Sequence, residues 1–417
     1  MNEFSYIFLF FLVTSLLLKL WLNKRQMSHV MYHRDSVPDD FKGKIDLDAH
    51  QKAADYTIAK TKVANLNTIL GSALLVVLTL GGIINVLVDA SQAYINNDIW
   101  SGVALIMCVF IASHLIELPI SIYQTFNIEQ AFGFNRTTVG QFIKDQFLQI
   151  ALMLTIGLPL LYALLWVMAK MGDYWWVYAW LLTISFTFFM TWLVPTFIAP
   201  LFNKFTPLED EALKSRITQL FERCGFNSKG IYVMDGSRRS GHGNAYFTGI
   251  GNNKRIVFFD TLIESLNTDE IEAVLAHELG HFKCKHITKQ MFVSTGVTLI
   301  GFALLGWLKQ QNWFFDGLGV LQINDAIALL LFILVTPIFT TFLQPIGSYF
   351  QRKFEFEADA FASTMAKPEH LIQALVKLYR ENASTLTPDP LYSSFHHSHP
   401  PAGVRINHLK SLANSAS

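Results

Sequence analysis

Long apolar runs separated by polar segments dominate this chain, and seven of them are long enough to cross a hydrocarbon core of ~30 Å as helices. We expect these spans at 4–22, 65–88, 99–122, 147–170, 174–197, 291–309 and 326–348. Only Met171–Asp173 separates the fourth span from the fifth, so these two should form a tight helical hairpin. The pattern therefore predicts an α-helical polytopic membrane protein.

Charged residues around the spans predict how the chain is oriented. Lys24 and Arg25 follow the first span, whereas segments 89–98 and 310–325 contain no lysine or arginine. Because basic residues concentrate on the cytoplasmic side, the N-terminus should lie outside and the tail inside. The first apolar run has no basic segment before it and no small-residue cleavage site, which predicts a retained anchor and not a signal peptide.

Composition narrows the class of protein further. Of the 417 residues, 52% are hydrophobic and 15% are charged, whereas soluble proteins carry about a quarter charged residues. The net charge is zero and no tract is rich in lysine or arginine, which argues against nucleic acid as a partner. Cys108, Cys224 and Cys284 are odd in number and far apart. They predict no disulfide framework and a catalytic region in a reducing compartment.

Two polar regions fall on the predicted cytoplasmic side and suggest how the chain is divided. We expect a membrane region at 1–197, a catalytic domain at 198–290, the last two spans at 291–348 and a C-terminal cytoplasmic region at 349–417.

The expected catalytic domain combines helices with a small sheet. A helix is predicted from Pro207 to Cys224. Three short strands are expected at 230–235, 244–250 and 255–263, with a turn at Asn252-Asn253 before the third. A second helix should begin after Asn267 or Thr268, either of which can cap it. The edge strand beside this helix could add a substrate strand through backbone hydrogen bonds.

The second helix carries the motif His277-Glu278-Leu279-Gly280-His281 within the proline-free segment 271–286. Residues four apart share a helical face, so His277 and His281 can bind one zinc ion. Glu278 lies beside them and is placed to act on a water that the ion activates. The alternative is a surface helix with two solvated histidines. The apolar flanks, among them Ile271 and Leu275, argue against that alternative, because buried histidines need partners.

A tetrahedral zinc site needs a third protein ligand, which in hydrolases is commonly a carboxylate. Glu355 and Asp359 lie four residues apart on a helix expected just after the last span. We expect Glu355 to bind the ion and Asp359 to orient one of the histidines. Glu357, ~200° around the helix from Glu355, is an alternative ligand. Taken alone, this cluster would be interpreted as an ordinary acidic helix face. Cys284 is best explained as a small packed residue.

These motifs together resemble a known family. The sequence HELGH, the sequence FEFEADAFA and Ser398-His399-Pro400-Pro401 followed by Arg405 are similar to those of the Ste24-type CAAX prenyl proteases, peptidase family M48. The resemblance extends from about residue 30 to the end of the chain. Its further matching segments are 132–135, 200–208, 244–247 and 254–262.

The resemblance implies more than the spacing does. It implies seven helices that enclose a water-filled chamber, with a cytoplasmic zincin-like α+β catalytic domain whose zinc site faces the chamber. It also implies that His399 helps to stabilise the oxyanion, that Arg405 supports the site, and that Asn244-Ala245-Tyr246 lies on the strand that holds the substrate. From the residues alone, His399 would be assigned to a solvated proline-rich loop and Arg405 to the surface.

The predicted function is that of a zinc endopeptidase with one ion per chain, acting on membrane-associated or CAAX-like peptides that can be lipidated. A membrane-protein quality-control protease is an alternative within the same class. A transporter or receptor with a structural metal would not need Glu278 as a base, and a lipid amidase would not need the Asn244 strand. The compact loops suggest a bacterial member, located in the inner membrane.

Overall fold

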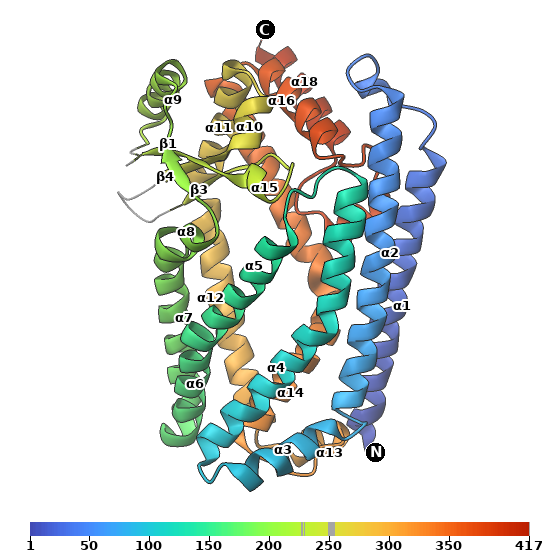
Figure 1. Cartoon of the computed structure of the whole chain (residues 1–417), viewed down its shortest axis with the longest axis vertical. Coiled ribbons are helices and arrows are strands. Elements are labelled where there is room, and N and C mark those ends of the chain that lie inside the picture. Colours follow the sequence, from blue (N-terminus) through green and yellow to red (C-terminus); the bar gives the residue numbers. More distant parts are fainter. Residues whose placement is uncertain (227, 229, 249–254, 417) are drawn as a thin grey trace.

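The computed structural model describes residues 1–416 apart from 227, 229 and 249–254. Within this part, seven helical runs are long and apolar enough to cross a membrane, and they follow the seven predicted spans in order. They lie along the long axis of the molecule, with a small α+β region at one end (Figure 1). The runs are α1 (Glu3–Tyr32), α2 (Leu47–Leu78), α4 (Asp98–Tyr123), α5 (Val139–Leu152) with α6 (Leu158–Lys170), α7 (Trp175–Leu193) with α8 (Ala199–Phe202), α12 (His286–Leu308), and α14 (Asp325–Thr340) with α15 (Gln344–Met365).

Shorter helices close the two ends of this arrangement. Those at the end that contains the N-terminus are α3 (Ile83–Tyr94) and α13 (Asn312–Gly317). Those of the other end are α9 (Glu211–Cys224), α10 (Asp260–Ser265), α11 (Thr268–Lys283), α16 (Pro368–Glu381), α17 (Pro390–His396) and α18 (Ala402–Ala416). The two termini lie at opposite ends of the molecule, as an odd number of spans requires (Figure 1).

The predicted second span was wrong in its bounds. Segment 65–88 is not one helix, because α2 ends at Leu78 and α3 begins at Ile83. Gly82 between them has a φ of 77°, a left-handed conformation that glycine adopts without steric cost. At the other end, α2 extends back to Leu47, where the side chain of Asp46 accepts a hydrogen bond from the Ala49 amide. A segment expected to be a polar loop is therefore helical.

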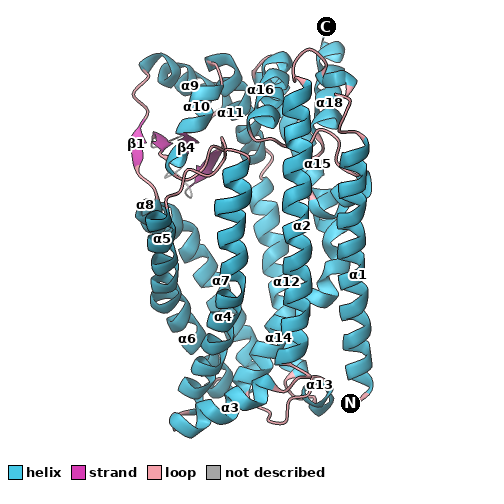
Figure 2. Ribbon diagram, turned by 45° about the vertical axis from the view of Figure 1, so that its right-hand side comes forward, coloured by secondary structure: helices cyan, strands magenta, loops and turns pink. Residues whose placement is uncertain are grey.

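Several helices continue past the membrane into the α+β region. Helices α1 and α2 contain 30 and 32 residues, and at ~1.5 Å per residue both exceed a hydrocarbon core of ~30 Å. The last span also continues: α14 passes through a single 3₁₀ turn, Thr341–Leu343, into α15. The helix that we expected as a separate element after residue 348 is thus an extension of the last span. This continuity connects the membrane directly to the candidate site (Figure 2).

The buried apolar residues form two main cores. One lies among the membrane helices and includes Phe8, Ile106 and Leu330. The other lies in the α+β region and includes Phe258 and Leu275. The apolar window of Gly172–Phe202 has 0% of its residues buried within the protein. Such unburied apolar residues are consistent with a chamber between the spans and lipid around them. The 3₁₀ turn Gly172–Tyr174 joins α6 to α7 and confirms the predicted hairpin.

The sheet of the α+β region has four strands in the order β1, β2, β4, β3. Strand β2 runs parallel to β4, whereas β1 and β3 are antiparallel edge strands. The strands are β1 (Phe205–Pro207), β2 (Ile231–Met234), β3 (Ala245–Thr248) and β4 (Arg255–Phe259).

The structure adds one strand to this region and corrects two predicted boundaries. Strand β1 was not predicted, and Pro207 belongs to it and not to α9, which begins after its cap Asp210. Strand β4 ends at Phe259 because Asp260 accepts hydrogen bonds from the Ser237 and Thr261 amides and α10 begins there. The Asn252-Asn253 turn and the end of the predicted strand 244–250 lie outside the described residues.

Candidate metal centre and active site

Helix α11 carries the predicted motif, and its start is the expected one. Asn267 caps it by accepting a hydrogen bond from the Glu270 amide, and the Glu270 side chain accepts one from the Asn267 amide in return. The helix is shorter than the predicted 271–286, since it ends at Lys283. Lys285 has a φ of 57°, and this left-handed residue redirects the chain into α12 at His286. The break brings His286 back toward the motif.

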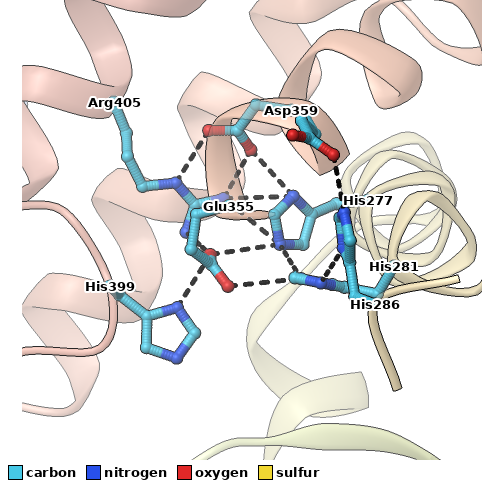
Figure 3. A network of polar contacts seen from close by, with 8 residues as sticks. His277, His281, His286, Glu355, Asp359, His399 and Arg405 are labelled. Carbon is cyan, nitrogen blue, oxygen red and sulfur yellow. Dashed lines mark hydrogen bonds and ion pairs between the residues drawn. The ribbon is translucent and has the colours of Figure 1, made fainter. Parts of the chain in front are cut away.

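Helices α11 and α15 approach each other closely at Gly280. A Cβ atom there would lie 2.9 Å from the Ala358 Cα, so only glycine fits. The contact brings the three predicted ligands together (Figure 3). The two Nε2 atoms of His277 and His281 are 3.3 Å apart. Glu355 Oε2 is 3.4 Å from His277 Nε2, and Glu355 Oε1 is 3.2 Å from His281 Nε2.

These separations fit a tetrahedral metal ion. Ligand atoms bound at 2.0–2.2 Å to a tetrahedral ion lie about 3.3–3.6 Å apart, close to the 3.2–3.4 Å between the three groups. Glu355 Oε2 is also buried without a hydrogen bond of good geometry from any described residue, although His399 Nδ1 is 2.8 Å away. The two imidazoles and the carboxylate are ligands that zinc prefers in hydrolases.

His277 is supported by a buried ion pair. Its Nδ1 lies 2.8 Å from Asp359 Oδ1, and the Asp359 side chain is 0% exposed. Arg405, on α18, donates two hydrogen bonds to the same carboxylate at 2.9 and 2.6 Å. Burial and the Arg405 charge lower the pKa of His277, but hydrogen bonds to Asp359 and Glu355 outweigh them and raise it to about 8. The surroundings of His277 therefore favour positive charge, as a metal site must.

His281 is supported by a second histidine, His286, which was not predicted from the sequence. His281 Nδ1 lies 3.0 Å from His286 Nδ1, and His286 Nε2 lies 3.0 Å from Glu357 Oε2. The His286 ring is buried and stacks on Phe354 with centroids 4.3 Å apart. On an unbroken helix, His286 would lie ~140° around from His281. The only sequence signal for this role of His286 was its position shortly after the motif. Assigning it to His281 required knowledge of the helix break at Lys285.

The alternative ligands lie apart from the three predicted ones. Glu357 contacts His286 and, at 3.6 Å, the Lys289 ammonium. Cys284 groups with His286 and Glu357 and not with the ligands of the main cluster. In this second group, His286 is already engaged on both ring nitrogens. The contacts favour a hydrogen-bonded support for His281 over a second metal site.

Glu278 and His399 are the two remaining predicted groups at the centre. The described residues provide no hydrogen bond or ion pair to the half-buried Glu278 carboxylate. His399 follows α17 and precedes Pro400, and its side chain is 63% exposed beside Glu355. The neighbouring His397 instead contacts the Ser393 hydroxyl at 3.0 Å, and burial lowers its pKa to about 4.

A cavity of about 760 Å³ adjoins this centre. His399 lines it, and so does Asn244, which directly precedes edge strand β3. The Asn244 carbonyl accepts a hydrogen bond from the Phe259 amide, which fixes that end of the strand against β4. Ala245 and Tyr246 follow on β3 and are half-buried. The cavity thus connects His399, which lies beside Glu355, to a sheet edge that can receive a peptide.

Comparison with known families divides the chain into two matching parts. Residues 26–204 match the family described as CAAX prenyl protease N-terminal, five membrane helices. Residues 207–413 match peptidase family M48. Together the two matches cover the membrane region and the α+β region that carries the centre.

Individual relatives agree with these matches. CAAX prenyl protease 1 of Saccharomyces cerevisiae is 40% identical over 71% of this chain and 69% of its own length. Its Caenorhabditis elegans homologue is 31% identical over 96% of this chain and 97% of its own. The crystal structure of Ste24p from S. mikatae superposes with a TM-score of 0.92 at 32% identity, covering 98% of this chain and 99% of that one.

Proposed function

The chain belongs to peptidase family M48, among the Ste24-type CAAX prenyl proteases, and on this premise we propose that one zinc ion is held by His277, His281 and Glu355. The protein is an integral membrane metalloendopeptidase. The observation that supports zinc is the donor set, two imidazoles and one carboxylate at tetrahedral separations. We further propose that Asp359 and Arg405 hold His277, as His286 and Glu357 hold His281.

The proposed mechanism assigns the proton transfers to Glu278. Bound zinc would supply Lewis acidity and lower the pKa of a coordinated water to ~7. Glu278 accepts a proton from the attacking water and delivers it to the leaving amine, a role that suits a carboxylate to which no described residue is paired. His399 donates a hydrogen bond to the oxygen of the attacked carbonyl, a contribution of ~3 kcal/mol for a well-placed donor. Its exposed ring beside Glu355 supports this role.

The substrate is proposed to bind as an additional strand. Among the described residues, edge strand β3 pairs with β4 on one side only, so the amide and carbonyl groups of its other side can pair with a peptide. Asn244, Ala245 and Tyr246 would hold the residues nearest the scissile bond. Main-chain pairing gives affinity for peptides of many sequences, which suits an endopeptidase.

We propose peptides at the membrane, lipidated CAAX-like chains among them, as substrates. Relatives named CAAX prenyl protease 1 support this class. Tyr56 and Lys60 of α2, a membrane helix, line the cavity beside the centre, so a substrate can reach it from the membrane side. The transporter and lipid-amidase alternatives are set aside because the family is one of peptidases.

For its placement, we propose a bacterial inner membrane with the N-terminus outside and the catalytic region in the cytoplasm. Lys24 and Arg25 after the first span support this orientation. Reporter fusions after residue 95 and after residue 417 should give signals on opposite sides. Signals on the same side would contradict the proposed orientation.

The proposed function is tested by an assay of the purified protein on a farnesylated CAAX peptide and on its unmodified counterpart. We expect cleavage of the farnesylated peptide, its loss on addition of a chelator, and its recovery on addition of zinc. Cleavage that survives complete removal of metal would contradict the proposed centre. Cleavage of the unmodified peptide at an equal rate would show that the lipid is not required for recognition.

A further inference from the structure

The position of His399 depends mainly on the chain that carries it. Its side chain is 63% exposed, and among the described residues Glu355 is its one partner within ion-pair distance (Figure 3). Pro400 and Pro401 follow His399, and their rings restrict the backbone on that side. The segment before His399, at the end of α17, has no such covalent restriction. The contacts of that segment are therefore the remaining restraint on the His399 ring.

Arg352 of α15 provides contacts to the end of α17. Its Nη1 donates hydrogen bonds to three main-chain carbonyls, those of Ser393 and Ser394 at 3.3 Å and that of His397 at 3.0 Å. The last carbonyls of a helix lack partners within it, and a basic side chain commonly supplies one. His397 is the C-cap of α17 and lies two residues before His399. Arg352 therefore fixes the chain just before His399.

One face of α15 carries both these contacts and the candidate metal ligand. The Ser348 hydroxyl donates a hydrogen bond to the Phe395 carbonyl at 3.0 Å, also near the end of α17. Spacings of four, three and four residues place side chains within ~60° of one another around a helix. The residues in this row are Ser348, Arg352, Glu355 and Asp359. A single helix therefore sets the relation between His399 and the candidate metal centre.

The surroundings of Arg352 argue against two other roles. Arg352 is half-buried, and in the part of the chain that the structure describes no aspartate or glutamate lies within ion-pair distance of it. Its guanidinium is thus bound to main-chain carbonyls and not to a surface carboxylate. Arg352 does not line the cavity beside the centre, so it is not placed to bind a peptide there. Any effect of Arg352 on the reaction must pass through the residues that it holds.

We propose that Arg352 is a positioning residue. It holds the end of α17, and with it His399, where the His399 ring can donate to the oxygen of the attacked carbonyl. This inference rests on the proposed role of His399 and adds a residue that touches neither the substrate nor the metal. A misplacement of ~1 Å caused by a substitution away from the reacting atoms can lower the rate ~10²-fold.

The test measures kcat, KM and zinc content of Arg352→Ala with the farnesylated CAAX peptide. The kcat should fall ~10–10²-fold, with little change in KM and with one zinc per chain retained. Arg352→Lys should keep most of the activity, because all three contacts come from one nitrogen and an ammonium has three donors. Lys353→Ala is the matched control, because Lys353 is exposed and makes no hydrogen bond or ion pair with a described residue.

A double-variant cycle separates this role from a purely structural one. If Arg352 acts through His399, Arg352→Ala should lower kcat much less in a His399→Ala background than in the wild-type background. A general structural defect would lower kcat by the same factor in both backgrounds. Equal factors would therefore overturn the inference, and so would a wild-type kcat in Arg352→Ala.

Amide hydrogen exchange provides a measurement that does not depend on turnover. In Arg352→Ala, exchange should accelerate at residues 393–399 and stay unchanged in α11. Unchanged exchange at 393–399 would contradict the inference. A harmless His399→Ala would instead refute the proposed role of His399, while faster exchange in Arg352→Ala would still show that Arg352 holds this segment.

Ser348→Ala is the second variant, used if Arg352→Ala does not fold. It removes one neutral hydrogen bond to the same segment, so kcat should fall ~2–10-fold in the wild-type background and little in the His399→Ala background. Equal factors in the two backgrounds would overturn the inference here as well.

Discussion

The two sides of the candidate metal centre are built differently, although both pair α11 with α15. On the His277 side, a fully buried Asp359 carboxylate is clamped by Arg405, whose side chain is 8% exposed. On the His281 side, the support is a second imidazole, His286, backed by the partly exposed Glu357. The support of His277 is a buried ion pair. The support of His281, which is called the relay below, is a chain of hydrogen bonds from His286 to the partly exposed Glu357.

Because the two supports differ, substitutions in one should mainly affect folding stability and substitutions in the other should mainly affect metal affinity. Breaking a buried ion pair leaves an uncompensated charge, which typically costs 3–5 kcal/mol of folding free energy. Removing an outer partner of a metal-binding histidine typically costs 10–100-fold in metal affinity. We therefore expect the His277 side to determine whether the region folds, and the His281 side mainly to determine how tightly the ion is held.

His399 belongs to neither side of the centre, and its substitution provides the reference with which substitutions on the two sides are compared. His399→Ala should lower kcat by ~10²–10³-fold, the loss typical of an oxyanion donor, with little change in KM. Zinc content and thermal unfolding should stay near wild type. His396→Ala is the control, since His396 lies on α17 and contacts Tyr392 instead of the centre. Equal damage by both substitutions would refute a specific role for His399.

The buried ion pair is tested by Arg405→Ala. This substitution should lower the free energy of unfolding by ~3–5 kcal/mol, because the Asp359 carboxylate stays buried beside His277 alone. Denaturant or thermal unfolding in detergent measures the change. Arg405→Lys should recover only part of it, because an ammonium cannot donate the two parallel hydrogen bonds of a guanidinium. An Arg405→Ala protein as stable as wild type would remove the proposed contrast between the two sides.

The relay is tested by His286→Ala. Zinc affinity, measured by competition with a chelator, should fall ~10–100-fold, while unfolding changes less than in Arg405→Ala. His286→Gln should restore much of the affinity, because its amide can accept from His281 and donate to Glu357. Lys289→Ala should change affinity little, since its contact with Glu357 is long and exposed. An unchanged affinity in His286→Ala would show that His281 needs no such support.

On the His277 side, the pairing of His277 with Asp359 could be predicted from residue spacing, and Arg405 followed only from the family resemblance. On the His281 side, the support by His286 was not predicted. Spacing by four residues relates His277 to His281 and Glu355 to Asp359 on unbroken helices, where a face can be assigned from residue numbers alone. His286 reaches His281 only because Lys285 takes a left-handed conformation. No property of a lysine predicts that conformation. The structure therefore adds a support that residue spacing could not find.

The membrane helices, too, could be predicted only in part from the sequence. Their number and order follow from apolar length, and the structure has all seven in the described residues. The end of α2 could not be predicted from apolar length, because apolar residues continue through the break at Gly82. The short strand β1 has too few residues to give a pattern, so its pairing with β2 was missed. The proposed division at 197, 290 and 348 stays a prediction, as do the roles assigned to the site residues.

The most direct test of the account is the zinc content and the peptide turnover of Glu278→Gln, measured on the same preparation. We expect the variant to keep one zinc per chain, since Glu278 is not proposed as a ligand, and hydrolysis to fall by ~10²–10⁴-fold because the general base is lost. The His277→Ala, His281→Ala double variant should lose the zinc. Turnover near the wild-type rate in Glu278→Gln, or loss of its zinc, would contradict the assignment of ligands and base on which the account depends.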